Sequence, residues 1–141
     1  QYTGYSVRKY HPRAGYSSTV GTEALNYKNN YRVIRFSDIL LMASEALLRS
    51  GGSVGEAQDY YARVVKRAMG DDYKVPTVSL DNIYKERRYE FAMEGIRYWD
   101  LVRTNQAKDF IKGWDDTKKY LPIPQSEIDK SDGHLVQNPH F

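Results

Sequence analysis

Hydrophobic residues recur at intervals of three and four along the first periodic segment of the chain, which is the spacing of an amphipathic helix. The segment begins near Arg32 and stops at Gly51-Gly52, where a glycine pair favours a helix end with a left-handed residue. Its apolar positions are Ile34, Ile39, Leu40, Met42, Ala43, Ala46 and Leu47. So broad an apolar face predicts a buried helix that ends at the glycine pair.

A second helix is predicted directly after that pair. Ser53 and Glu56 have the spacing of a capping box, in which the serine side chain accepts from the third backbone N–H and the glutamate reaches back. Hydrophobic residues follow until Gly70, at Ala57, Tyr60, Tyr61, Val64, Val65 and Ala68. Helices joined by so short a link must pack antiparallel, as in a tetratricopeptide-like hairpin. Such hairpins cover their apolar faces by stacking, so we expect this one to pack on further helices.

A third helix is expected to start at Ser79, a residue type that caps helix N-termini. Its apolar stripe consists of Leu80, Ile83, Tyr84, Phe91 and Ala92. Gly95 lies near the predicted end, and Arg97 to Arg103 predict a further short helix.

The rest of the chain lacks a sustained period. Residues 1–30 hold glycines, a proline and polar patches, which favours an irregular lead-in with room for a short strand around Tyr5 to Tyr10. From Asn105 the apolar period fades. The segment Leu121-Pro122-Ile123-Pro124 is extended, because each proline keeps its predecessor out of the helical region. One turn is expected at Ser126 to Asp129.

The predicted fold class is therefore mostly α, with a tetratricopeptide-like helical hairpin, further helices and long irregular loops. We expect residues 1–30 to be a lead-in that belongs to an upstream part of the protein. Residues 31–141 are expected to form one helical domain.

Composition matters mainly for what it excludes. The 141 residues include no cysteine, which rules out disulfides and thiolate metal sites. No apolar run reaches the roughly 18 residues of a membrane span. The formal charge is +3 and acids and bases are interleaved, so we expect no nucleic acid partner. The chain begins at Gln1 without a basic leader or an apolar segment, so any targeting segment is expected upstream.

Charged residues gather along the third helix and after it, at Glu86, Arg87, Glu90, Glu94, Arg97, Asp100 and Arg103. On one continuous helix Glu86, Glu90 and Glu94 form a row at four-residue spacing, and three like charges in a row repel. We therefore expect arginines from elsewhere, including Arg97 and Arg103, to fold back and neutralise the row. The prediction is a structural ion network.

The rival interpretation of these acids is a glycosidase pair made of Glu90 and Glu94. That chemistry needs two carboxyl groups roughly 5 to 9.5 Å apart with the substrate between them. Neighbours on one helix point the same way and leave no room for a sugar, and nearby arginines would keep both ionised. No catalytic residue is therefore predicted.

The sequence contains no motif typical of a metal or cofactor site. His11, His134 and His140 are far apart and lack the spacing of a helical metal pair. The acidic pairs Asp71-Asp72 and Asp115-Asp116 lack the pattern of a calcium loop. The glycines form no phosphate-binding motif. We predict neither a metal site nor a cofactor.

Trp99 and Trp114 are the candidates for stacking against a sugar, whose apolar ring face suits an indole. Trp99 lies within the charged cluster and is expected in the core. Trp114 lies in a polar loop and is the better candidate for a ligand or partner contact. A loop tryptophan folded back onto its own domain remains the alternative.

Residues 86–103 resemble the E-R-x-x-E-[FL]-x-x-E-G-x-R-x-x-D-L-x-R signature of the SusD/RagB family, with every fixed position filled. Upstream, Arg35 to Met42 with Glu45-Ala46 is similar to the family's arginine-aromatic and Glu-Ala helix. Downstream, its closing motifs are matched by Leu121 to Gln125, Glu127-Ile128 and Gln137-Asn138-Pro139. One departure is a valine, Val65, where the second helix of the family usually has an arginine.

The resemblance implies the C-terminal part of a SusD-like α-α superhelix. It further implies a surface-exposed lipoprotein of the outer membrane, anchored by a lipid on the missing N-terminus, which works with a SusC-like TonB-dependent transporter and binds a glycan or oligosaccharide. In the family the ligand-binding aromatics lie largely upstream of this region. This part is therefore expected to be mainly scaffold and transporter-facing surface. The rival functions are a helical-repeat domain that binds a peptide, the glycosidase, and a basic RNA-binding helical domain.

Overall fold

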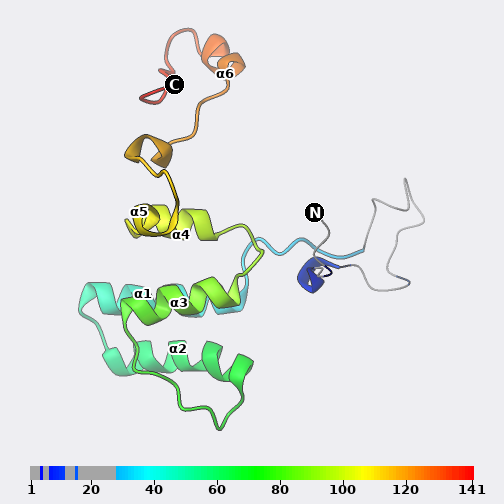
Figure 1. Ribbon diagram of the computed structural model, residues 1–141, viewed down its shortest axis with the longest axis vertical. Coiled ribbons are helices and arrows are strands. Elements are labelled where there is room, and N and C mark those ends of the chain that lie inside the picture. Colours follow the sequence, from blue (N-terminus) through cyan, green and yellow to red (C-terminus); the bar gives the residue numbers. More distant parts are fainter. Residues whose placement is uncertain (1–3, 5–6, 12–14, 16–27) are drawn as a thin grey trace. The chain divides into compact units, whose positions relative to one another are not determined.

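The computed structural model describes residues 4, 7–11, 15 and 28–141, and it divides the chain into two compact units, residues 1–93 and 94–141 (Figure 1). Every regular element in the described residues is a helix, as the mostly α prediction requires. The division into a lead-in, residues 1–30, and one helical domain, residues 31–141, stays a prediction. Among the described helices we find none with the length and apolar character needed to cross a bilayer.

The first unit is built on an antiparallel hairpin of α1, Phe36–Ser50, and α2, Val54–Met69 (Figure 1). The first helix begins later than the predicted Arg32, because Arg35 is extended, with φ −119° and ψ 157°. It ends at Gly51, whose φ of 70° is left-handed, and the Gly52 N–H donates to the Leu47 carbonyl at 2.8 Å. The hairpin predicted from the Gly-Gly-Ser link is confirmed.

Small residues let α1 and α2 approach closely. Ser44 and Ala57 are both fully buried, and the Ser44 hydroxyl donates to the Ala57 carbonyl at 2.8 Å. Leu41 and Val64 are buried on the same two helices and supply the apolar area of the interface. A larger side chain at either small position has no space to occupy.

Ser53 caps α2 as predicted, since its hydroxyl accepts from the Glu56 N–H at 3.2 Å. The second half of the capping box takes a different form. The Glu56 carboxylate accepts from the Tyr60 hydroxyl at 2.6 Å, one helical turn further along the same exposed face. The start of α2 is therefore fixed by the serine.

The helix α3, Leu80–Glu90, packs against α1 and buries Ile83 and Tyr84. Ser79 is its N-cap, as predicted, and accepts from the Asn82 N–H at 3.1 Å. The prediction that this helix continues toward Gly95 is wrong. Met93 and Gly95 have left-handed φ values of 67° and 81°, which a right-handed helix does not accommodate.

This earlier end removes Glu94 from the helix. Glu86 and Glu90 remain one turn apart on α3, whereas Glu94 belongs to the second unit. The predicted row of three carboxylates on one helix is therefore a pair.

A short lead-in segment attaches to the C-terminal end of α3. Arg8–Tyr10 form the 3-10 helix η1, so the strand expected around Tyr5 to Tyr10 is wrong for residues 8–10, and Tyr5 and Ser6 lie outside the described residues. The Lys9 ammonium donates to the Glu90 carbonyl at 2.5 Å.

The second unit is built from α4, Arg97–Arg103, α5, Ala107–Phe110, η2, Asp116–Lys119, and α6, Gln125–Lys130. The predicted helix at Arg97 to Arg103 and the predicted turn at Ser126 to Asp129 are confirmed. The single turn of α5 is too short to produce a periodic pattern, and the sequence did not predict it.

The extended stretch before α6 is paired by side-chain amides. Gln137 accepts from the Ile123 N–H at 2.8 Å and donates to the Ile123 carbonyl at 2.9 Å, so it takes the place of a neighbouring strand. Asn138 donates to the Leu121 carbonyl at 2.6 Å. The motif at residues 121–125 and the motif at residues 137–139 thus bind each other.

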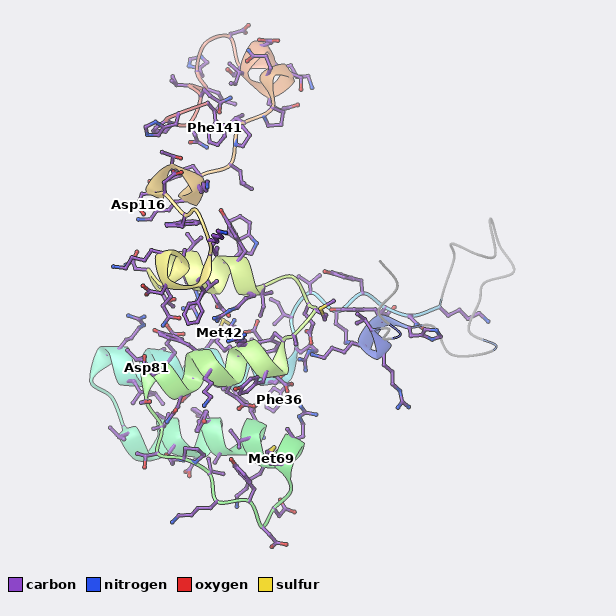
Figure 2. The ribbon with its side chains drawn as sticks, viewed as in Figure 1. Phe36, Met42, Met69, Asp81, Asp116 and Phe141 are labelled. Carbon is purple, nitrogen blue, oxygen red and sulfur yellow. The ribbon has the colours of Figure 1, made fainter. Side chains whose placement is uncertain are left out.

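The hairpin leaves an apolar face uncovered on α1. Phe36 is 63% exposed, Ile39 46% and Met42 41%, and Phe36 and Met42 can be located in Figure 2. Large apolar side chains in a group are costly to leave in water. The prediction that this hairpin stacks on further helices accounts for such a face and stays a prediction.

We predict that Ala57→Leu lowers the free energy of unfolding by about 1–3 kcal/mol, because the added volume has to displace α1 at the contact with Ser44. Ala68→Leu makes the same change at an exposed position of α2 and is the matched control, with an expected effect within about 0.5 kcal/mol. Urea unfolding followed by circular dichroism measures both. Equal effects at the two positions would contradict the close packing.

Candidate functional site

The carboxylate of Glu90 is the centre of a buried ion cluster in the first unit. Arg35, the residue before α1, donates to Oε1 at 2.9 Å and to the Glu90 carbonyl at 3.1 Å. Arg67, near the end of α2, donates to Oε2 at 2.6 Å. Both carboxylate oxygens are therefore bound by a guanidinium, and each guanidinium comes from a different segment of the hairpin.

The buried ring of Phe91 contacts both Arg35 of this cluster and Arg87 of a second ion pair. Phe91 is 4% exposed, and the guanidinium carbons of Arg35 and Arg87 lie 4.9 and 5.1 Å from its ring centre. Arg87 is itself buried and binds the carboxylate of Asp38 on α1 at 2.6 Å. The C-terminal end of α3 is thus fixed to the start of α1 by two ion pairs and by an aromatic ring that contacts the arginine of each.

The environment of Glu90 favours its charged form. Burial would raise the pKa of this carboxyl, but hydrogen bonds from Arg35 and Ser37 and the charge of Arg67 outweigh it and hold the pKa below the ordinary value. For Glu86, one turn earlier, burial and then the negative charge of Glu90 raise the pKa. The two neighbours on α3 are therefore shifted in opposite directions.

The structure distributes the predicted charged cluster over both units. Glu86, Arg87 and Glu90 belong to the first unit, and the arginines on the Glu90 carboxylate are Arg35 and Arg67. In the second unit, Asp100 is buried and binds Arg103 at 2.9 Å.

Glu94 and Arg97, the remaining two members of the predicted cluster, also lie in the second unit. The Arg97 guanidinium lies 5.0 Å from the ring centre of Phe110. That Arg97 and Arg103 fold back to neutralise the acids stays a prediction, as does the network as a whole.

Four residues that pair with buried polar or charged side chains, or are buried themselves, were not predicted from the charge pattern: Arg35, Asp38, Glu45 and Arg67. Glu45 is buried on α1, where it accepts from Arg49 at 2.8 Å and from the Tyr84 hydroxyl at 3.2 Å. A signal was available, because Asp38 and Glu45 stand two turns apart on an otherwise apolar helix, and such acids are almost always paired.

The geometry gives no support to Glu90 as a glycosidase residue. An acid catalyst needs a carboxyl group that holds a proton near neutral pH and touches the substrate. The Glu90 carboxylate is ionised, buried and bound at both oxygens. Its proposed partner Glu94 lies beyond the end of α3.

Candidate metal ligands do not gather within the described residues, where no three histidine or acidic side chains are placed to hold an ion. Asp115 instead caps η2 by accepting from the Thr117 N–H at 3.0 Å, and hydrogen bonds from Thr117 hold the pKa of Asp115 below its ordinary value. Asp116 binds Lys119 at 3.2 Å.

The prediction that Trp99 lies in the core is wrong, since its side chain is 50% exposed. The short helix α4 buries its Asp100 and Leu101 side and leaves Trp99 facing outward. Trp99 touches the ring of Tyr98 edge-on, with ring centres 5.1 Å apart.

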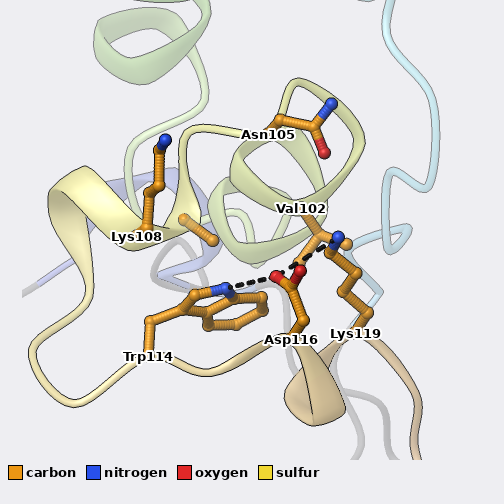
Figure 3. A pocket seen from close by; sticks show the side chains of 7 residues that line it. Val102, Asn105, Lys108, Trp114, Asp116 and Lys119 are labelled. Carbon is orange, nitrogen blue, oxygen red and sulfur yellow. Dashed lines mark hydrogen bonds and ion pairs between the residues drawn. The ribbon is translucent and has the colours of Figure 1, made fainter.

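Trp114 lies partly buried against its own unit, and it forms one wall of a small cavity (Figure 3). The cavity measures about 150 Å³, and the residues around it are Val102, Asn105, Ala107, Lys108, Trp114, Asp116 and Lys119. The indole N–H donates to the Asp116 carboxylate at 3.3 Å, and the ring of Tyr98 meets the indole edge-on at 6.1 Å. The lining of this cavity combines an aromatic wall, an asparagine, the Asp116–Lys119 ion pair and a second lysine, Lys108.

The end of α4 places Asn105 at the cavity. The Gln106 N–H donates to the Leu101 carbonyl at 2.9 Å and the Asn105 N–H to the Val102 carbonyl at 3.2 Å, which is the Schellman pattern. Asn105 takes the left-handed position with φ 57°, where glycine is the usual residue.

A sequence model described as the SusD family matches residues 1–141, the whole chain. The chain belongs to the SusD family. Among curated relatives, SusD-like protein P2 of Formosa agariphila is 25% identical over 96% of this chain. A SusD-like protein of Bacteroides ovatus is 32% identical over 55% of it. The alignments cover 30% and 14% of those relatives, so the chain spans only a minor part of their length.

Solved structures of the SusD type share the fold. Surface glycan-binding protein A from Bacteroides thetaiotaomicron is 44% identical and superposes with a TM-score of 0.72, covering 84% of this chain and 26% of its own. A laminarin-binding SusD-like protein is 40% identical with a TM-score of 0.79, covering 100% of this chain and 30% of its own. The SusD/RagB resemblance inferred from residues 86–103 is confirmed.

We predict that Glu90→Gln lowers the free energy of unfolding of this SusD-family chain at pH 7 by about 1–3 kcal/mol, because it leaves Arg35 and Arg67 facing a neutral amide. A carboxyl with a lowered folded pKa stabilises the fold above its unfolded pKa, and this contribution is lost as pH falls through the folded pKa. The difference between the wild type and Glu90→Gln should therefore shrink below about pH 4.

Glu86→Gln is the matched control on the same helix. The pKa of Glu86 is shifted in the opposite direction, so the expected change in stability is also opposite. A carboxyl with a raised folded pKa costs stability once it is ionised, so removal of its charge leaves the chain equally or more stable at pH 7. Chemical denaturation at pH 3 to 8 measures both variants. Equal destabilisation by the two changes would contradict the different environments of these acids.

Proposed function

We propose that this SusD-family chain is part of a glycan-binding protein that captures an oligosaccharide without cleaving it. The observation that carries the proposal is the similarity to solved glycan-binding structures. One of them is surface glycan-binding protein A in complex with laminarihexaose, 45% identical over 83% of this chain with a TM-score of 0.69. Because the chain covers 26% of that structure, the binding of a glycan is proposed here for the whole protein.

The ligand class that we propose is a neutral oligosaccharide, with laminarin-type glucans as the first candidates. Two similar solved structures support this ligand class. One contains laminarihexaose, and the other is a laminarin-binding SusD-like protein. Absence of cleavage is supported by the state of Glu90, whose ionised carboxylate is enclosed by Arg35 and Arg67.

The cellular role that we propose follows from the family resemblance. The protein would be a surface-exposed outer-membrane lipoprotein that delivers the glycan to a SusC-like TonB-dependent transporter. Within it, the described helices would serve mainly as scaffold and transporter-facing surface. The exposed apolar residues of α1, Phe36, Ile39 and Met42, provide surface for packing against other parts of such an assembly.

The purified protein is predicted to bind laminarihexaose and to leave it intact. Isothermal titration calorimetry measures the binding, with maltohexaose as the control for linkage, and chromatography of the sugar after prolonged incubation measures cleavage. Release of shorter sugars that disappears in Glu94→Gln would replace our proposal by the glycosidase. Failure to bind any of a panel of neutral glycans would also contradict it.

A further inference from the structure

We propose that the cavity beside Trp114 binds one pyranose ring of a neutral glycan, as a site within the second unit. The inference rests on the proposed glycan-binding function. It adds the location of one sugar-binding site and the residues that would contact the sugar. The cavity volume of about 150 Å³ lies below the roughly 300–1,000 Å³ of pockets for drug-sized ligands, which limits the occupant to a single ring.

The apolar part of the cavity suits the C–H face of a sugar ring. Trp114 supplies a flat indole, and Val102 and Ala107 supply aliphatic surface. The indole is held in place before any ligand arrives, because its N–H donates to Asp116 and its ring rests against Tyr98. A fixed aromatic wall avoids the entropic cost of ordering a side chain upon binding.

The polar part of the cavity suits hydroxyl groups. Each sugar hydroxyl both donates and accepts, and the Asn105 amide offers a donor and an acceptor on one side chain. Asp116 and Lys119 form an ion pair at 3.2 Å, which is drawn as a dashed line in Figure 3. Lys108 adds a second ammonium group to the lining, and both lysines can donate to hydroxyl oxygens of the sugar.

Asn105 provides an argument of its own. Its left-handed position would cost less with glycine, so asparagine there gives up some stability. What asparagine adds is an amide, and Asn105 is one of the residues that line the cavity. Asparagine is a common alternative to glycine at this helix end, so Asn105 can end α4 and also bring a polar side chain to the lining.

Asn105→Gly separates this role from folding. Glycine suits the φ of 57°, so the variant should fold with equal or higher thermal stability while it lacks the amide. We expect its affinity for a sugar at this site to fall about threefold to tenfold. Trp114→Ala should lower the affinity about tenfold, and Trp99→Phe, which alters the other tryptophan, should leave it unchanged.

This chain contains Trp99 and Trp114, and the indole resonance that disappears in Trp114→Ala identifies Trp114 in the spectrum of the protein. In nitrogen-15 spectra of the protein, we expect methyl β-D-glucopyranoside to shift the indole N–H resonance of Trp114 and to leave that of Trp99 in place. Methyl β-D-glucuronide is the charged counterpart and should bind no more tightly.

The outcomes distinguish the site from the general function. If laminarihexaose binds and Trp114→Ala and Asn105→Gly bind it with wild-type affinity, this site is refuted and the proposed function stands. If the glucoside shifts Trp114 although no oligosaccharide binds, the site stands and the proposed function fails. A glucoside that leaves Trp114 unshifted, or a glucuronide that binds tenfold more tightly, refutes the proposal as stated.

Discussion

A buried carboxylate has to be paired, and in this chain that requirement holds three helices together. Glu90 ends α3, and its two oxygens are bound by Arg35 at the start of α1 and by Arg67 near the end of α2. Loss of Arg35 would remove the guanidinium from one oxygen of this buried carboxylate and leave the mostly exposed Arg67 on the other, which costs more than the intact pair contributes. The contacts of the Phe91 ring with Arg35 and with Arg87 extend the same constraint to Asp38, the partner of Arg87. These contacts specify one arrangement of α3 on the hairpin.

The pairing of the buried Glu90 carboxylate with arginines also limits what this residue can do in catalysis. A carboxylate that the fold keeps ionised and enclosed is poorly suited to donate a proton or to touch a substrate, so the acid-rich segment serves as architecture. In the glycan-binding role that we propose, contact with a sugar depends on side chains that remain accessible, such as those around the cavity with Trp114 and Asn105. That role needs a rigid frame and a preformed surface together.

Sequence alone predicted the features that local signals determine. Ser53 and Ser79 marked helix starts, and Gly51 marked a helix end, because capping depends on residues within one turn. The early end of α3 was missed, since methionine at a left-handed φ has no sequence signature. The partners of Glu90 were missed because Arg35 is 55 residues away and Arg67 is 23, and charge patterns along one helix do not reveal such contacts. The exposure of Trp99 and the cavity beside Trp114 likewise depend on the short helices α4 and α5, whose few residues give no periodic pattern in the sequence.

Titration of the glutamate side chains by carbon-13 nuclear magnetic resonance measures whether the arginines keep Glu90 charged. We expect the carboxyl carbon of Glu90 to titrate below the ordinary glutamate pKa and that of Glu86 to titrate above it. A Glu90 resonance that titrates at or above the ordinary pKa would mean that burial prevails over the two arginines, and the carboxylate would then not be the fixed centre of this fold.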